Sequence, residues 1–306
     1  MMYLRNSYLR FSCLCLAIFF SLSAVSYADS SKIPTTYLLL PGGTYFYEGD
    51  YRTGASFAIP EIGLLATGIL VNDKMGKQDK TSEINAPSLL AFQLYAVDKW
   101  SYFQKEVLRV KAENPEFKLK IDDTPLSDLM VAPFKREVIS SPLVVAFALL
   151  GIADGIYGYP ERKRSFSDID NVTAMGNRMS RDSGTGYYEG MAFAVSYGAG
   201  VSEEMLFRGF MLPVIDYKYG KRAGLVSSSL TFGLLHAFNP GLQNPAYTVT
   251  QATLAGFIFG YSVQKEDYKL SKAIAAHFWY DFFSMTTTWL TNPNENPLGV
   301  QVTFRF

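Results

Sequence analysis

Apolar and amphipathic runs alternate with polar stretches along most of this chain. The runs lie at residues 55–71, 85–104, 141–160, 188–214, 222–238, 246–264 and 270–291. A helix that crosses a bilayer needs about 20 mostly apolar residues. The pattern therefore predicts an all-α fold, a polytopic transmembrane helical bundle with polar loops. Several runs are shorter than this length, so a soluble helical domain with apolar core helices is the alternative.

The N-terminal segment has the pattern of a secretory signal. Arg5 and Arg10 precede an apolar stretch from Phe11 to Ala24, and small residues around Ala28 suit cleavage there. We predict a signal peptide at residues 1–28, with an uncleaved first transmembrane helix as the alternative. The only two cysteines, Cys13 and Cys15, lie inside this segment, so a mature chain would have no disulfide.

Three further regions follow from the same pattern. Residues 29–140 are expected to form a membrane hairpin and an amphipathic region. In the hairpin, LLLPGG suggests a half-helix followed by a loop and a spanning helix. Pro60 and Glu61 interrupt the apolar pattern there, which leaves a soluble core helix as the alternative. Residues 141–291 are expected to form a helical bundle, and residues 292–306 a tail.

Two segments fit the bundle less well. Residues 161–187 are polar and rich in glycine and serine, so we predict a mobile loop. In the tail, Val300, Val302 and Phe304 alternate with polar residues as they do in a strand, although a helical bundle provides no evident partner.

The net charge of the chain argues against a nucleic-acid partner. Lysine and arginine total 28, and aspartate and glutamate also total 28, so the formal net charge is zero. A nucleic-acid-binding protein usually shows a basic excess, and none is present. We therefore expect no nucleic acid as a partner, and the predicted spanning helices would contact membrane lipid.

The first candidate site residues are Glu203, Glu204 and Arg208, in the otherwise apolar stretch GAGVSEEMLFRGF. Ionisable groups in such a stretch are costly and usually functional. Glu204 and Arg208 are spaced i,i+4, which places them on one helix face as an ion pair. Glu203 points about 100° away on the helix and has no such partner, so we expect it to act in a site.

The only two histidines, His236 and His277, lie downstream in apolar stretches. A single histidine in such a stretch is more often a core residue than a ligand. His277 and Asp281, however, are spaced i,i+4, and a carboxylate can orient a histidine. With Glu203, these groups are the types that activate water or bind a metal. The HExxH motif is absent, which excludes a zincin-type site.

Three short motifs that contain these residues resemble the motifs of a known protease family. EEMLFR is similar to the EExxxR motif of the CPBP family, the CAAX-processing and bacteriocin-processing intramembrane proteases related to the Rce1-type prenyl protease. FGLLH, ending at His236, resembles its FxxxH motif, and HFWYD, from His277 to Asp281, resembles HxxxN or HxxxD. The resemblance covers residues 141–291. Asp281 departs from the usual asparagine, and an ionised aspartate cannot donate a hydrogen bond to an oxyanion.

The resemblance implies an intramembrane endopeptidase that acts on a peptide or membrane protein. The signal peptide indicates a bacterial chain, so we expect the bacterial inner membrane. Glu203 with His236 would activate the attacking water, and His277 with Asp281 would stabilise the oxyanion or complete a metal shell. Zinc, if any metal is bound, would be held by Glu203, His236 and His277, and the same residues could act without metal. A non-catalytic membrane scaffold that retains the motifs and binds a partner protein is the alternative.

Overall fold

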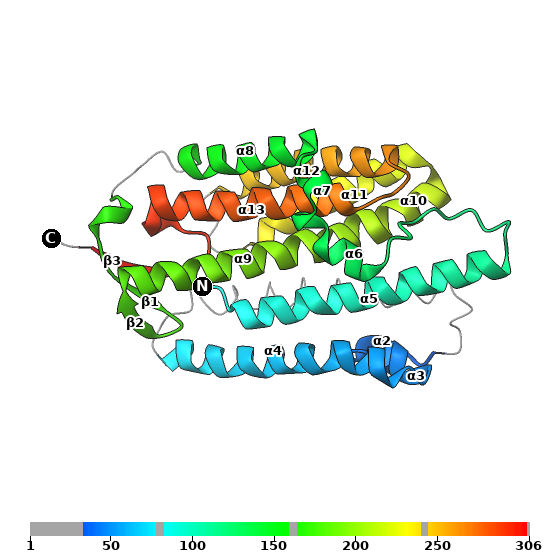
Figure 1. Cartoon of the computed structure of the whole chain (residues 1–306), viewed down its shortest axis with the longest axis horizontal. Helices are drawn as coiled ribbons and strands as arrows, with labels where there is room; N and C mark the ends of the chain where they lie inside the picture. Colours follow the sequence, from blue (N-terminus) through cyan, green and yellow to red (C-terminus); the bar gives the residue numbers. More distant parts are fainter. Residues whose placement is uncertain (1–32, 78–82, 159–163, 240–243, 305–306) are drawn as a thin grey trace. The chain divides into compact units, whose positions relative to one another are not determined.

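The structure is a computed structural model that describes residues 33–77, 83–158, 164–239 and 244–304 (Figure 1). The expected signal peptide and both cysteines lie outside these residues. The chain is mostly helical and divides into two compact units made of alternating segments. Unit 1 consists of Met1–Ile62, Phe92–Met130 and Ser202–Leu270; unit 2 consists of Gly63–Ala91, Val131–Val201 and Ser271–Phe306.

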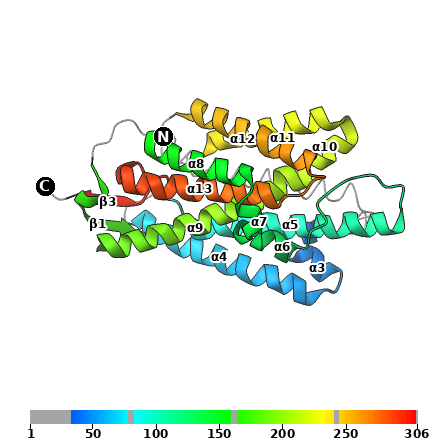
Figure 2. The same cartoon turned by 45° about the horizontal axis from the view of Figure 1, so that its top comes forward.

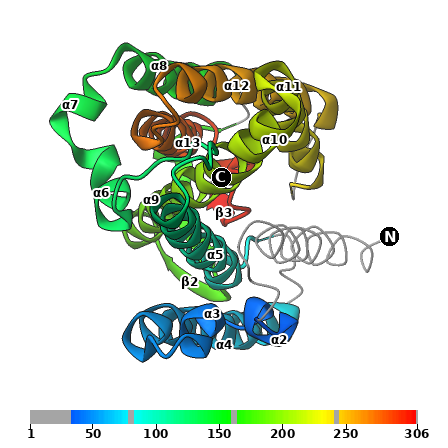
Figure 3. The ribbon, with the colours of Figure 1, turned by 90° about the vertical axis from the view of Figure 1, so that its right-hand side faces the viewer.

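Unit 1 begins with two short helices and a long one. These are α2 (Thr35–Leu39), α3 (Gly43–Tyr47) and α4 (Tyr51–Lys77), of which α4 continues into unit 2 (Figure 3). Between α2 and α3, Gly42 has a φ of +62°, and a Cβ there would lie 2.1 Å from the Gly54 carbonyl oxygen. Only glycine suits both the positive φ and this close approach. A short helix, a turn and a long helix follow in the expected order, and α4 continues through Pro60. That α4 spans a membrane stays a prediction.

The rest of unit 1 is also helical. It contains most of α5 (Ala86–Glu113), the short α6 (Leu126–Val131), α10 (Leu212–Tyr219), α11 (Lys221–Leu235) and α12 (Pro245–Lys265). The last two lie side by side (Figure 2). The Asn244 side chain begins α12 by accepting a hydrogen bond from the Tyr247 amide at 3.1 Å.

Unit 2 is built on two long helices and an apolar one. They are most of α9 (Arg181–Leu206), α13 (Ser271–Thr291) and α8 (Pro142–Tyr157), preceded by the single turn α7 (Arg136–Ile139). Helices α8 and α13 pack along each other (Figure 1). The contact is close because Gly151 and Gly155 of α8 face α13; a Cβ on Gly151 would lie 2.3 Å from the Tyr280 carbonyl oxygen.

Unit 2 also contains a small antiparallel sheet in the order β2-β1-β3, which corrects two expectations. Strands β1 (Ile169–Ala174) and β2 (Asn177–Ser180) form a hairpin where we expected a mobile loop, and their presence means that the fold is not purely all-α. The turn is possible because Met175 and Gly176 both adopt positive φ, 46° and 74°. The tail is a strand, as its alternation indicated: β3 (Gln301–Phe304) pairs with the free edge of β1.

The sheet is held by the core of unit 2. Tyr188 of α9 stacks on Trp289 of α13 with ring centroids 4.3 Å apart, and both side chains are buried. Ile169 and Val172 of β1 belong to the same cluster. A Cβ on Gly184 would lie 2.3 Å from the Val172 Cβ, so α9 approaches the hairpin directly. Segments distant in sequence therefore form one apolar core.

One described helix is long and apolar enough to cross a membrane, at Tyr51–Gly76 of α4. The apolar helix Pro142–Tyr157 is shorter than a spanning segment needs. The helical character of the chain is thus confirmed, whereas the polytopic arrangement stays a prediction.

Candidate functional site

The Glu204–Arg208 pair is present and completely buried in unit 1. Arg208 Nη1 donates to Glu204 Oε1 at 2.9 Å, and both side chains have 0% exposure. The pairing predicted from i,i+4 spacing is therefore what the structure contains. A buried ion pair of this kind contributes little net stability, but loss of one partner leaves the other charge unpaired.

The Arg208 guanidinium lies among aromatic rings. Its central carbon is 4.2 Å from the Phe232 ring centroid, 5.5 Å from that of Phe259 and 5.8 Å from that of Phe207. Helix α12 can approach because residue 256 is glycine; a Cβ there would lie 3.2 Å from Arg208 Nη2. Cation–π contacts thus surround a guanidinium of which Nε and Nη2 have no hydrogen-bond partner among the described residues.

The helix changes its winding at this point. Residues Phe207–Met211 form a π-helical segment that begins three residues after Glu204, and the Ser228 hydroxyl of α11 donates to the Phe207 carbonyl oxygen at 3.0 Å. Short π-helical segments occur frequently at functional sites. A π-helical turn holds more residues than an α-helical turn. The side chains that follow Glu203 and Glu204 therefore point in other directions than they would in an uninterrupted α-helix.

His236 lies at the end of α11 and is half-buried. Its Nδ1 is 2.7 Å from the Phe232 carbonyl oxygen, and its ring centroid is 4.5 Å from that of Phe232. A carbonyl oxygen only accepts, so Nδ1 carries a proton in this contact, and in the neutral ring the lone pair is then on Nε2. Phe232 therefore contacts both Arg208 and His236, and His236 Nε2 has the form required of a general base.

The third motif lies in unit 2. His277 of α13 is 5% exposed, and its Nε2 is 3.4 Å from Asp281 Oδ2 on the same helix face. The distance suits an orienting ionic contact and is long for a strong hydrogen bond. Near this motif, a Cβ on Gly200 of α9 would lie 2.9 Å from the Phe278 amide nitrogen. The pairing of His277 with Asp281 follows the sequence prediction.

Glu203 is half-buried, and its charge acts on Arg208 together with that of Glu204. The structure thus gathers Glu203, Glu204, Arg208 and His236 within unit 1, while His277 and Asp281 belong to unit 2. That Glu203, His236 and His277 meet in one site stays a prediction.

The expected zinc ligands are divided between the two units. Among the described residues, no group of three His, Cys, Asp or Glu side chains could hold a metal ion. Unit 1 offers Glu203 and His236 from this set, and a zinc site uses three or four protein ligands. The third expected ligand, His277, belongs to unit 2, so a zinc site at these three residues stays a prediction.

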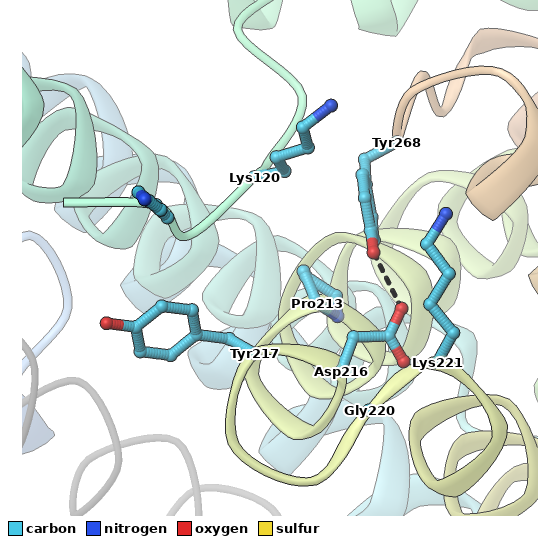
Figure 4. Close-up of a pocket in the computed structure, with 8 residues that line it drawn as sticks. Lys120, Pro213, Asp216, Tyr217, Gly220, Lys221 and Tyr268 are labelled. Carbon is cyan, nitrogen blue, oxygen red and sulfur yellow. Dashed lines mark hydrogen bonds between the residues drawn. The ribbon is translucent and has the colours of Figure 1, made fainter. Parts of the chain in front are cut away.

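A separate pocket of about 220 Å³ lies in unit 1, and no motif residue lines it (Figure 4). Lys118, Lys120 and Lys221 line it together with Asp216 and Tyr268. Asp216 Oδ2 accepts hydrogen bonds from the Tyr268 hydroxyl at 2.7 Å and from Gln264 at 2.8 Å. Burial raises the pKa of the Asp216 carboxyl, and these two hydrogen bonds oppose the increase. The hydrogen bond from Gln264 connects Asp216 of α10 to α12, so this carboxyl stabilises the packing of the two helices.

Sequence reasoning missed the residues that enclose Arg208. Phe259 and Gly256 of α12 and Ser228 of α11 were treated only as parts of apolar runs. The signal available in the sequence was weak: glycines at 256 and 260 bracket Phe259, a spacing typical of close helix packing.

Comparison with known families gives one match. A family model described as type II CAAX prenyl endopeptidase Rce1-like matches residues 188–283, about a third of the chain. The matched range contains all three motifs, and the match confirms the resemblance to the CPBP proteases. No curated protein and no solved structure matches the chain.

Proposed function

Because residues 188–283 belong to the Rce1-like family of type II CAAX prenyl endopeptidases, a membrane-embedded protease family, we propose that this protein is an intramembrane endopeptidase. Its substrate is a peptide or a membrane protein. The observation that carries the proposal is the contact of His236 Nδ1 with the Phe232 carbonyl oxygen at 2.7 Å: with Nδ1–H donating there, the neutral ring has Nε2 available as a base.

In the proposed reaction Glu203 and His236 together remove a proton from the attacking water. His277, oriented by Asp281, stabilises the negative charge that develops on the scissile carbonyl oxygen. Within unit 2, Gly200 of α9 packs against α13 at Phe278, the residue after His277. The buried environment strengthens each of these electrostatic effects.

Glu204 and Arg208 have a different role in this proposal. Their charges neutralise each other, and the guanidinium fills the aromatic enclosure between α11 and α12. We propose that this pair holds the helices in register, and that Glu203 is the acidic group that acts on water. In this proposal Glu204 stabilises the fold, and its neighbour Glu203 takes part in the reaction.

The test is proteolysis by the purified full chain in detergent micelles. The probes are fluorescence-quenched transmembrane peptides, with a prenylated CAAX peptide among them. We expect cleavage by the wild type and a loss of about 10²–10⁴-fold in Glu203→Gln and in His236→Ala, the range for a general base. Glu116→Gln, which alters an exposed glutamate of unit 1, is the matched control and should retain full activity.

Wild-type activity in Glu203→Gln would remove the enzyme proposal. If no probe is cleaved by any variant while all of them still bind the same membrane partner, the non-catalytic scaffold becomes the better description. Metal content of the wild type, measured beside His236→Ala, decides separately between metal-free and metal-assisted chemistry: a stoichiometric metal lost in the variant would identify His236 as a ligand.

A further inference from the structure

A second group of buried ionisable side chains lies in unit 1, outside the family match. Glu61 of α4 and Asp98 of α5 are both 0% exposed, and Lys99 of α5 is 5% exposed. Nothing in the proposed proteolysis uses them. Buried charges of this kind persist only where they are paired or neutralised.

Asp98 and Lys99 neutralise each other. Lys99 Nζ donates to Asp98 Oδ2 at 2.7 Å and to the Leu40 carbonyl oxygen at 2.9 Å. The Gly42 amide donates to the same Asp98 oxygen at 2.9 Å. The pair is thus anchored to the backbone turn between α2 and α3, and its net charge is zero.

Glu61 has no such arrangement. Both of its carboxylate oxygens are buried without a hydrogen-bond partner among the described residues, and so is Asp98 Oδ1. Its carboxyl lies within electrostatic range of Asp98 and Lys99. If all three groups were ionised, the cluster would hold two negative charges against one positive charge. One bound cationic species balances the cluster, and the smallest is a proton.

The position of Glu61 strengthens this argument. It lies in α4, the described helix that is long and apolar enough to cross a membrane. Ile59, Ile62 and Ile69 of the same helix are 72%, 56% and 70% exposed, so the apolar side of α4 faces outward and Glu61 faces inward. Ionisable residues on the inner side of a membrane helix commonly mark proton or ion pathways.

We propose that the carboxyl of Glu61, on α4, is a proton-binding site. At neutral pH the Glu61 carboxyl holds one proton, and as the pH rises it releases that proton to water and becomes a carboxylate beside Asp98. The charged neighbours are Asp98 and Lys99 of α5, and the titratable group of α3 on this side is Tyr45, whose hydroxyl donates to Ser101 at 2.9 Å. Deprotonation therefore leaves an unbalanced negative charge beside Asp98 and lowers the stability of this part of unit 1.

The experiment is infrared spectroscopy of the full chain in detergent micelles, following the carbonyl stretch of protonated carboxylic acids. At neutral pH we expect a band in the wild type that is missing in Glu61→Gln and retained in the exposed control Glu116→Gln. The melting temperature of the wild type should fall as the pH is raised above neutral, and Glu61→Gln should show a smaller fall, since glutamine cannot lose a proton.

Three outcomes would contradict the proposal. An unchanged band in Glu61→Gln means that Glu61 is ionised. Failure of Glu61→Gln to fold has the same meaning, because glutamine matches the shape and neutrality of a protonated glutamate. A melting temperature that depends on sodium concentration at fixed pH identifies a metal cation as the ligand instead. Retention of the band in Glu203→Gln separates this site from the proposed protease centre.

Discussion

At the scale of single residues, Arg208 is the most consequential side chain of unit 1. It combines full burial, one ion pair and three aromatic neighbours. Arg208→Ala would leave Glu204 as an unpaired buried charge, and Glu204→Ala would do the reverse, so each should cost about 3–5 kcal/mol of unfolding free energy. Thermal unfolding and folded yield in detergent measure the effect.

Two comparisons sharpen this prediction. Arg208→Lys keeps the charge but loses the planar group that stacks on Phe232, so its stability should be intermediate. Glu203→Gln should leave yield almost unchanged. A collapse of Glu203→Gln with a harmless Arg208→Ala would mean that the roles of the two glutamates are reversed.

Asp216 gives a prediction about pH. Burial raises the pKa of its carboxyl in the folded protein above the unfolded value of about 3.9. The folded state therefore binds more protons than the unfolded state above that pH, and this residue's contribution to stability falls as the pH rises through the folded pKa. Asp216→Asn should flatten this part of the stability profile, measured by unfolding at several pH values.

Asp267 provides a control of opposite sign. The hydrogen bond from Lys120, at 2.6 Å, lowers the pKa of this exposed carboxyl. Its contribution is present above the unfolded pKa and is lost as the pH falls, so Asp267→Asn should cause a small loss at neutral pH. If Asp216→Asn showed the same pH dependence as Asp267→Asn, the burial argument for Asp216 would be wrong.

At the scale of elements, the packing of α8 on α13 depends on glycine. In Gly151→Val a Cβ would lie 2.3 Å from the Tyr280 carbonyl oxygen, and the helices would have to separate. Overpacking of this kind costs about 1–3 kcal/mol. The measurement is the thermal stability of the full chain.

Gly190 on α9 is the matched control, because a Cβ there would meet nothing within 4 Å. Gly190→Ala should raise stability by up to about 1 kcal/mol through its better helix propensity. Equal effects at the two positions would show that backbone propensity, and not the α8–α13 contact, governs the response.

At the scale of the whole molecule, we predict an integral membrane protein. The apolar α4 and the exposed Leu149 and Leu150 of α8 present surfaces that water disfavours. The full chain should remain in the membrane fraction after alkaline carbonate or high salt and should require detergent for extraction. Release by carbonate, alongside a peripheral marker protein, would favour the soluble helical domain.

The sequence by itself determined the local features. Runs at 222–238, 246–264 and 270–291 became α11 with its terminal turn, α12 and α13, almost to the residue. The contacts of Glu204 with Arg208 and of His277 with Asp281 also follow from spacing, because residues four apart on a helix are neighbours in any fold. Periodicity and capping act within a few residues, so they can be read from the chain directly.

Only the tertiary structure decided the rest. The tail strand found its partner in β1, more than 100 residues earlier, and a supposed loop became the other half of that sheet. Phe232 contacts both Arg208 and His236 because the helices around α11 pack together, and Glu61 is buried within electrostatic range of Asp98 and Lys99 of α5. These outcomes depend on which faces of distant segments meet, and the local pattern of a segment does not specify its partner.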